Sequence, residues 1–310
     1  MRALPFGQLA PRPVQGTNQS MSQTTLPPWT GIDIPPAHLS EFVGKGVWDE
    51  RTIAEQAQAL AEAEPDFIAF IDAGVTMTRA EAVADARALA AALHARGLRA
   101  GDVISFQVPN WREAAVINLA AAMAGLVVNP VVPIYRDHEV SQMLGDCGAK
   151  AFFVAASFRS FDYAAMAQRI KADLPALDHV FTVRGKGADD YAGLIAQGRN
   201  LPLPQVKVDP RGVKMVLYTS GTTGKPKGVL HSHTTLAHIL RTSCDFWGVT
   251  AGEATLMPSP VTHISGYANG LEAPFICGTC TVLMESWNAS DAIALIEAHG
   301  LVGTVAATPF

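Results

Sequence analysis

The sequence is poor in cysteine, in charge of either sign and in long apolar runs. Only four of its 310 residues are cysteine, and its 23 Lys and Arg residues are outnumbered by 28 Asp and Glu residues. So few cysteines argue against a small disulfide-rich scaffold. A net charge of −5 provides no basic surface, so we expect no nucleic-acid partner.

The longest apolar stretch, residues 114–128, contains Asn118 and is interrupted by Gly125. It is shorter than the roughly 20 residues that a membrane-spanning helix requires, so we predict no membrane span. The N-terminus lacks a compact apolar segment followed by a cleavage site, which argues against a secretory signal. A transit peptide and a true start at Met21 both stay open, and a cytoplasmic location is the default expectation.

Residues 1–45 are rich in Pro, Gln, Ser and Thr without periodicity, which predicts an irregular N-terminal extension. Beyond them, segments with strand-like and helix-like apolar spacing alternate. This alternation predicts an α/β fold with parallel-rich sheets flanked by helices. Two of the predicted helices begin with apparent capping boxes, Thr78 to Glu81 and Asn110 to Glu113.

Cys277 and Cys280 have the CxxC spacing found in zinc and redox sites. No second pair follows, and apolar residues lie on both sides, so we interpret the motif as a turn between buried segments. His231 and His233 lack an acidic neighbour in sequence, and the chain has no G-x-S-x-G motif. We interpret both histidines as polar residues at a helix start, and we predict no metal ligand.

The segment YTSGTTGKPKGV, residues 218–229, has the composition of an anion site. It follows an apolar strand-like run and should therefore lie at the carboxyl end of a parallel sheet, where open α/β folds bind ligands. Glycines let backbone N–H groups face an anion, hydroxyls donate hydrogen bonds and lysines add positive charge. The segment fits neither the Walker A pattern nor G-x-G-x-x-G. The predicted phosphate-binding residues are Thr219, Ser220, Gly221, Thr222, Thr223, Gly224, Lys225 and Lys227.

Residues 219–228 resemble the phosphate-binding signature of the AMP-forming, adenylate-forming enzymes, which include acyl-CoA synthetases, luciferases and peptide-synthetase adenylation domains. The resemblance covers about residues 50–310. Residues 101–110 look like an early region of that family, PSPVTHISG at 258–266 resembles its second block, and residues 304–309 resemble a later strand that ends in proline. The resemblance implies the N-terminal subdomains of the adenylate-forming fold, with residues 46–310 as a partial AMP-binding domain.

In this family a carboxylate attacks ATP to give an acyl-adenylate and pyrophosphate, and a thiol, often that of coenzyme A, then displaces AMP. The resemblance therefore implies ATP, coenzyme A and a small carboxylic acid as partners, with Mg²⁺ held by residues outside this sequence. It implies that His263 is the catalytic residue that positions the carboxylate or gates the acyl pocket. It also implies that Tyr267, Asn269 and Gly270 line that pocket, with ordinary helix packing as an equal alternative for Tyr267.

The family's later blocks supply a magnesium-binding glutamate, a ribose-binding aspartate and a catalytic lysine, and none of these blocks is found in this sequence. We therefore expect a truncated chain that is inactive alone. Three functions stay open: an acid:CoA ligase, an adenylating enzyme with a different acceptor, and a noncatalytic nucleotide- or acyl-binding module. The sequences of residues 257–263 and 303–310 weakly resemble those of ligases for medium-chain or cyclic acids such as cyclohexanecarboxylate. Neither the acid nor the oligomeric state is predicted.

Overall fold

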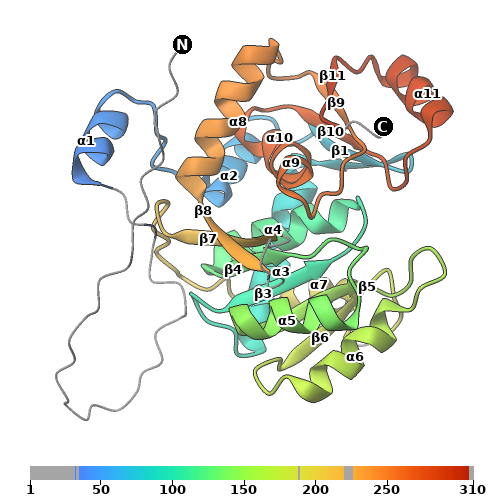
Figure 1. Cartoon of the computed structure of the whole chain (residues 1–310). Coiled ribbons are helices and arrows are strands. Elements are labelled where there is room, and N and C mark those ends of the chain that lie inside the picture. Colours follow the sequence, from blue (N-terminus) through green and yellow to red (C-terminus); the bar gives the residue numbers. More distant parts are fainter. Residues whose placement is uncertain (1–31, 33–34, 188, 220–225, 307–310) are drawn as a thin grey trace, which may run out of the picture.

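The computed structural model describes residues 32, 35–187, 189–219 and 226–306 (Figure 1). It confirms the predicted α/β class, because its helices alternate with strands that form two mostly parallel sheets. The first sheet has the strand order β11-β9-β10-β1-β2, and the second has the order β6-β5-β3-β4-β7-β8. Strand β2 runs antiparallel to β1, and β8 runs antiparallel to β7, whereas the other described pairs are parallel.

The strands are short and largely buried. The first sheet contains β1 (Ile68–Asp72), β2 (Val75–Thr78), β9 (Ala254–Met257), β10 (Cys280–Leu283) and β11 (Gly303–Thr304). The second contains β3 (Val103–Gln107), β4 (Val127–Pro130), β5 (Ala149–Ala155), β6 (His179–Val183), β7 (Val213–Thr219) and β8 (Lys227–Ser232). Near-continuous apolar strands such as β3 and β5 are expected where helices cover both faces of a sheet.

The helices lie between and around the two sheets. They are α1 (Pro36–Gly44), α2 (Ile53–Ala63), α3 (Arg79–Ala95), α4 (Arg112–Ala124), α5 (Asp137–Cys147), α6 (Tyr163–Asp173), α7 (Tyr191–Gly198), α8 (His233–Trp247), α9 (Ile264–Gly266), the π-helix η1 (Tyr267–Glu272), α10 (Ala273–Ile276) and α11 (Ala289–His299). Within the described residues, every helix is too short or too polar to cross a bilayer.

Helix α4 is the central element of the core. It contacts β1 and η1 on the side of the first sheet, and β3 and β4 on the side of the second. Nearly all of its residues are buried, and its many alanines allow close approach from every side. Helices α5 and α6 pack against the second sheet near β5, and α11 packs beside β9 of the first (Figure 1).

One of the two predicted capping boxes is confirmed. The Thr78 hydroxyl accepts a hydrogen bond from the Glu81 N–H (3.2 Å), and the Glu81 carboxylate accepts one from the Thr78 N–H (2.8 Å). The box predicted at Asn110 is wrong, because Trp111 is the N-cap of α4 and makes no side-chain cap. The Asn110 side chain faces the first sheet instead, where its amide donates to three backbone carbonyls at the ends of β9 and β10, those of Met257, Ser259 and Met284.

Two further elements differ from the sequence-based expectation. Helix α1 lies inside residues 1–45, which we predicted to be irregular; it begins with Pro36, a residue whose fixed φ suits the first helical turn. Strand β8 was not predicted. Its sequence KGVLHS contains a glycine and lacks a clear alternation of apolar and polar residues, and its first three residues are exposed in the structure.

Candidate functional site

The predicted phosphate-binding segment spans the tip of the β7–β8 hairpin. Strand β7 is parallel to β4, so the segment begins at a carboxyl end of the second sheet, as predicted. Thr219 and Lys227 are register partners across the hairpin, and the Thr219 hydroxyl donates to the Lys227 carbonyl (3.5 Å). Both residues are exposed. The other predicted members of this set, Ser220, Gly221, Thr222, Thr223, Gly224 and Lys225, lie outside the described residues.

The hairpin corrects one feature of the sequence-based interpretation. The alternation of strand-like and helix-like segments implied that a helix would follow this segment, but the segment runs into β8, which pairs with β7 along its length. Helix α8 begins only after Ser232, whose hydroxyl accepts a hydrogen bond from the Thr235 N–H (3.1 Å). Thr219 and Lys227, at the two ends of the segment, are therefore held side by side.

A side chain below the hairpin was missed by the sequence analysis. Tyr218, the residue before Thr219, is buried, and its hydroxyl donates to Asp146 of α5 (2.5 Å). Burial and this hydrogen bond raise the pKa of Tyr218 far above its usual value, so the phenol stays protonated. The contact fixes the end of β7 against α5. A strand that ends with a tyrosine after apolar residues carries no sequence signal that its hydroxyl will bond to an aspartate so far away in the chain.

His263 lies on a different segment, immediately before α9. Its side chain is exposed, and its Nδ1 lies 3.1 Å from the Ser265 hydroxyl. The backbone around it is well fixed: its N–H donates to the Pro260 carbonyl (2.9 Å), and its carbonyl accepts from the Tyr267 N–H (2.7 Å). The segment Ser259–Gly266 also packs tightly, because a Cβ on Gly266 would lie 2.1 Å from the Pro260 carbonyl oxygen. The geometry thus presents the imidazole to solvent from a rigid turn.

The neighbouring candidates divide between packing and local hydrogen bonding. Tyr267 is fully buried and belongs to a polar cluster described below. The Asn269 amide donates to the Ser265 carbonyl (3.0 Å), and a Cβ on Gly270 would meet the Met257 side chain at 2.8 Å. The packing interpretation therefore fits Tyr267 and Gly270.

Four buried side chains meet where α4, β7 and η1 touch, and we call them the buried quartet: Asn118, Lys214, Tyr267 and Glu272. Lys214 forms an ion pair with Glu272 and also donates to the Asn118 Oδ1 (3.3 Å). The Tyr267 hydroxyl donates to the same oxygen (2.5 Å), and the Asn118 amide donates to Glu272 (3.2 Å). Burial lowers the pKa of Lys214, while the Glu272 carboxylate opposes that effect. The quartet was not predicted.

The two histidines near the hairpin have structural surroundings. His233 is the first residue of α8, as predicted, and its Nδ1 accepts a hydrogen bond from the Ile53 N–H (3.2 Å). His231 lies in β8 instead of at the helix start, so that part of the interpretation is wrong. Burial lowers the pKa of both imidazoles and keeps them neutral near pH 7.

A cavity of about 240 Å³ lies where strands of both sheets end. Its lining comes from the residues that follow β3, β4, β5, β9 and β10 at their carboxyl ends. Asn110 contributes to it, and Arg159 donates across to the Ser286 hydroxyl (3.1 Å). Pro260 also lines it and accepts the hydrogen bond from the His263 N–H. Carboxyl ends of parallel strands are the usual ligand side of an α/β sheet, so this cavity adds to the candidate site.

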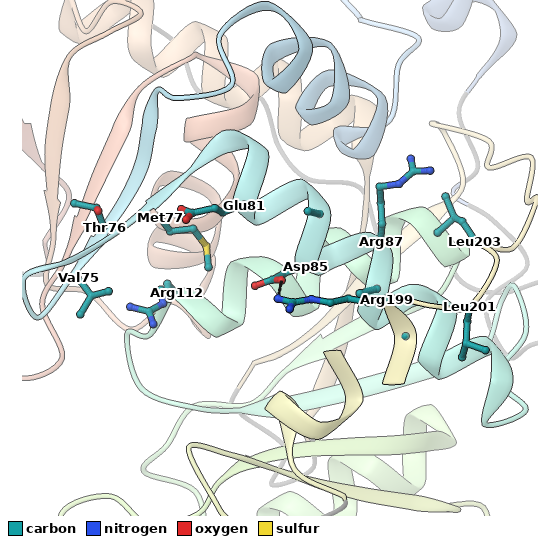
Figure 2. A pocket seen from close by; sticks show the side chains of 13 residues that line it. Val75, Thr76, Met77, Glu81, Asp85, Arg87, Arg112, Arg199, Leu201 and Leu203 are labelled. Atoms are coloured by element: carbon teal, nitrogen blue, oxygen red, sulfur yellow. Dashed lines mark hydrogen bonds and ion pairs between the residues drawn. The ribbon is translucent and has the colours of Figure 1, made fainter. Parts of the chain in front are cut away.

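A larger cavity of about 780 Å³ lies elsewhere, beside α3, α7 and β2 (Figure 2). Its charged lining includes Glu81, Arg87 and Arg112, together with an ion pair between Asp85 and Arg199 (3.3 Å). Among the residues that the structure describes, no predicted phosphate-binding residue lines this cavity, and neither does His263. We therefore place the candidate site by chemistry and strand ends, not by cavity size.

Comparisons with known proteins identify the family and the fold. Residues 56–310 match the family described as AMP-binding enzyme. The chain is 31% identical over 278 residues to the medium-chain fatty-acid–CoA ligase of Escherichia coli (strain K12), covering 86% of this chain and 48% of that protein. It is 30% identical over 285 residues to a salicyl-AMP ligase / salicyl-S-ArCP synthetase of Mycobacterium tuberculosis, covering 88% of this chain and 49% of that protein. The chain thus spans about half the length of these relatives.

Solved structures show the same fold. The apo structure of MbtA from Mycobacterium smegmatis aligns with a TM-score of 0.80 and 27% identity, covering 89% of this chain and 51% of that one. An inhibitor-bound N-terminal domain of FACL13 from Mycobacterium tuberculosis aligns with a TM-score of 0.71 and 25% identity, covering 81% and 61%. The predicted arrangement of parallel-rich sheets and helices is therefore shared with these proteins.

Proposed function

The chain belongs to the AMP-binding enzyme family, and on that premise we propose that the protein that carries it is an AMP-forming acid:CoA ligase. In the first half-reaction a carboxylate oxygen attacks the α-phosphorus of ATP, and the bond to pyrophosphate breaks. In the second, the sulfur of coenzyme A attacks the acyl carbon, and AMP leaves. The observation that carries the proposal is the match of residues 219–228 to the family's phosphate-binding signature at the carboxyl end of β7.

The residues at the base of the hairpin suit the first half-reaction. As pyrophosphate leaves, negative charge grows on its oxygens, and fixed donors there lower the barrier. Lys227 presents an exposed ammonium group, and Thr219 presents an exposed hydroxyl, on either side of the glycine- and threonine-rich tip. One hydrogen bond from a charged group to a phosphate contributes about 1.5–3 kcal/mol. We propose that the whole predicted set, residues 219–225 and Lys227, holds the triphosphate.

His263 is the residue that we propose for positioning the carboxylate or gating the acyl site. Its backbone is held by Pro260 and Tyr267, and its ring is oriented by Ser265. A ring fixed in this way keeps one nitrogen in a defined role, as donor or acceptor toward a ligand. The exposure of the ring leaves it free to contact a substrate.

Several finer points belong to the same proposal. Residues 46–310 would form part of an adenylation domain, and coenzyme A would be the acceptor in a cytoplasmic reaction. Mg²⁺, when bound with ATP, would neutralise triphosphate charge. Among the residues that the structure describes, no group of three or more His, Cys, Asp or Glu side chains is arranged to hold a metal ion, so we derive no step through it.

A second candidate is an adenylating enzyme with a different acceptor. It is favoured by the similarity to the salicyl-AMP ligase / salicyl-S-ArCP synthetase, which is close in identity and coverage to the match with the fatty-acid–CoA ligase. A noncatalytic nucleotide- or acyl-binding module is the third. These functions differ in acceptor and turnover, so kinetics can separate them.

The test is the exchange of labelled pyrophosphate into ATP by the protein that carries this chain. We expect exchange only when a carboxylic acid is present, and the acid panel would contain a medium-chain fatty acid, salicylate and cyclohexanecarboxylate. Formation of an acyl-CoA on adding coenzyme A supports the ligase, whereas exchange without acyl-CoA formation supports a different acceptor. ATP binding without exchange for any acid would overturn both enzymatic proposals.

A further inference from the structure

The structure brings together two cysteines that are not the CxxC pair. Cys244 lies near the end of α8, and Cys277 follows α10 directly. Both line one cavity of about 330 Å³, together with Arg241, Asp245 and a few residues of the following turn. Cys277 is half-buried, and exposed residues of that turn, such as Thr250, border the same cavity. Small molecules in solvent can therefore approach the two sulfur atoms.

The backbone explains why Cys277 does not face Cys280. Gly278 has a φ of +73°, which turns the chain between α10 and β10, as the sequence analysis expected for this motif. Cys280 then enters β10 and packs in an apolar cluster with residues such as Ile71 and Leu256. Cys277 instead packs against a separate cluster that α8 shares with α10. The two sulfurs of the CxxC motif therefore have different surroundings.

The two cavity thiols also affect each other's charge. Interaction between the two side chains lowers the pKa of Cys244 and raises that of Cys277. Burial raises the pKa of Cys147 to about 12 and that of Cys280 to about 11. Of the charged neighbours, Asp245 opposes thiolate formation at both cavity cysteines, and Arg241 favours it at Cys277. The interaction within the pair thus favours the thiolate at Cys244, which is buried at the wall of the cavity, and leaves the half-buried Cys277 as the thiol.

We propose that Cys244 and Cys277 are a reversible oxidation site, at which a peroxide converts the two thiols into a disulfide that links α8 to α10. The shared cavity provides access for the peroxide, and it places the second thiol on the same wall as the first, as the partner for the second step. Cysteines that act this way in other proteins are accessible, have an easily formed thiolate and lie beside a resolving cysteine.

The chemistry balances with one peroxide for each pair. The Cys244 thiolate attacks one peroxide oxygen, the O–O bond breaks, and water leaves after protonation, so that Cys244 becomes a sulfenic acid. The Cys277 sulfur then attacks the Cys244 sulfur, forms the S–S bond and breaks the S–O bond. The proton from Cys277 leaves with the second water. Two thiols and one peroxide thus give a disulfide and two waters, and a dithiol reductant reverses the result.

The test is peptide mapping of the reduced chain after brief peroxide treatment and alkylation of the remaining thiols. Trypsin combined with a protease that cleaves after Glu places Cys244 in residues 242–253 and both CxxC cysteines in residues 273–285. We expect these two peptides to become linked, with Cys147 still alkylated. The linked species should disappear on treatment with dithiothreitol.

Two variants assign the link to one sulfur. Cys280→Ala should keep the linked peptides, whereas Cys277→Ser should abolish them and leave Cys244 trapped as a sulfenic acid, detected with a dione probe. The oxidised wild type should also unfold at a higher temperature than the reduced form, because a crosslink between residues 244 and 277 restricts the unfolded chain. The proposal would be overturned by any of three results: four alkylated cysteines after peroxide treatment, a link that requires Cys280, or a link between two copies of the chain.

Discussion

Helix α4 joins two polar clusters that differ in how far water reaches them. The buried quartet, near the middle of α4, has Lys214 at 3% exposure and Glu272 at 0%. The second cluster, at the start of α4, consists of Asp72, Glu113 and Arg184, and we call it the Arg184 triad. Its two carboxylates are buried, whereas its Arg184 side chain is 34% exposed. Each cluster connects residues of the first sheet or η1 with residues of the second sheet.

The difference in exposure assigns different roles to similar ion pairs. In the quartet a single buried positive charge meets a single buried negative charge, so removing either group leaves the other uncompensated. In the triad Arg184 pairs with both Glu113 (2.9 Å) and Asp72, and the Asp72 carboxylate also accepts the Arg112 N–H (3.1 Å). The triad has spare partners and solvent screening. Similar contacts should therefore differ several-fold in their effect on stability.

The largest expected effect is that of Lys214→Met. We expect it to lower the free energy of unfolding by about 3–5 kcal/mol, because Glu272 stays buried without its ion-pair partner. Urea denaturation would measure the change. A loss below about 1 kcal/mol would show that the quartet tolerates an unpaired carboxylate, and the comparison with the triad would fail.

The double variant Lys214→Met with Glu272→Leu is the matched control. It removes both charges while keeping apolar volume, and we expect it to recover stability to within about 1 kcal/mol of the wild type. Recovery would identify the uncompensated charge, not lost packing, as the cause. A double variant no better than the single one would assign the loss to packing instead.

The next-largest expected effect is a loss of stability in acid, which we assign to His233. Burial lowers the pKa of His233 well below its usual value of 6.5, with a smaller contribution from the charge of Lys214. Below about pH 6.5 this histidine therefore binds a proton in the unfolded chain but not in the folded chain. The free energy of unfolding consequently decreases as the pH falls. We expect His233→Asn, which retains an acceptor for the Ile53 N–H, to remove about 1–2 kcal/mol of the loss between about pH 7 and pH 5. An unchanged pH dependence would rule out His233 as the source.

Arg184→Ala should have a smaller effect, about 1–2 kcal/mol, because loss of the partly exposed Arg184 side chain lets water reach Asp72 and Glu113, and Asp72 keeps the Arg112 N–H as a partner. The loss should shrink further at about 1 M salt, where charges are screened beyond roughly 3 Å. Urea denaturation at low and at high salt would measure the loss of unfolding free energy under each condition. Arg169→Ala is the control, since Arg169 makes an exposed pair with Asp137 (2.8 Å) that should contribute almost nothing. Equal losses for Lys214→Met and Arg184→Ala would remove the distinction between the clusters.

The two clusters also mark what was predictable from the sequence. The alternation of most helices and strands was predictable because apolar periodicity is local, although α1 and β8 were missed. The segment at residues 219–228 could be proposed as a phosphate site because its glycines, threonines and lysines are contiguous. Lys214 and Glu272 lie 58 residues apart, and nothing local to either residue indicates that they meet. Asn110 was misassigned as a helix cap because its true partners, three carbonyls of the first sheet, come more than a hundred residues later.

The site follows the same division. The position of the segment at a strand end and its exposed base residues were predictable, whereas strand β8 and the Tyr218–Asp146 contact required the fold. The thiol pair is a further case: CxxC spacing drew attention to Cys280, yet the partner of Cys277 is on α8. Sequence patterns therefore located chemistry within single segments and missed chemistry shared between segments.

Lys227→Ala tests the central claim, that the β7–β8 hairpin holds the triphosphate of ATP, most directly. Lys227 is exposed, so the variant should change the free energy of unfolding by no more than about 0.5 kcal/mol. ATP affinity of the protein that carries this chain would be measured by titration calorimetry for the wild type, Lys227→Ala and the control Lys207→Ala, at an exposed lysine outside the hairpin. We predict a loss of roughly tenfold or more for Lys227→Ala and none for Lys207→Ala. Equal ATP affinity in all three proteins would contradict the account.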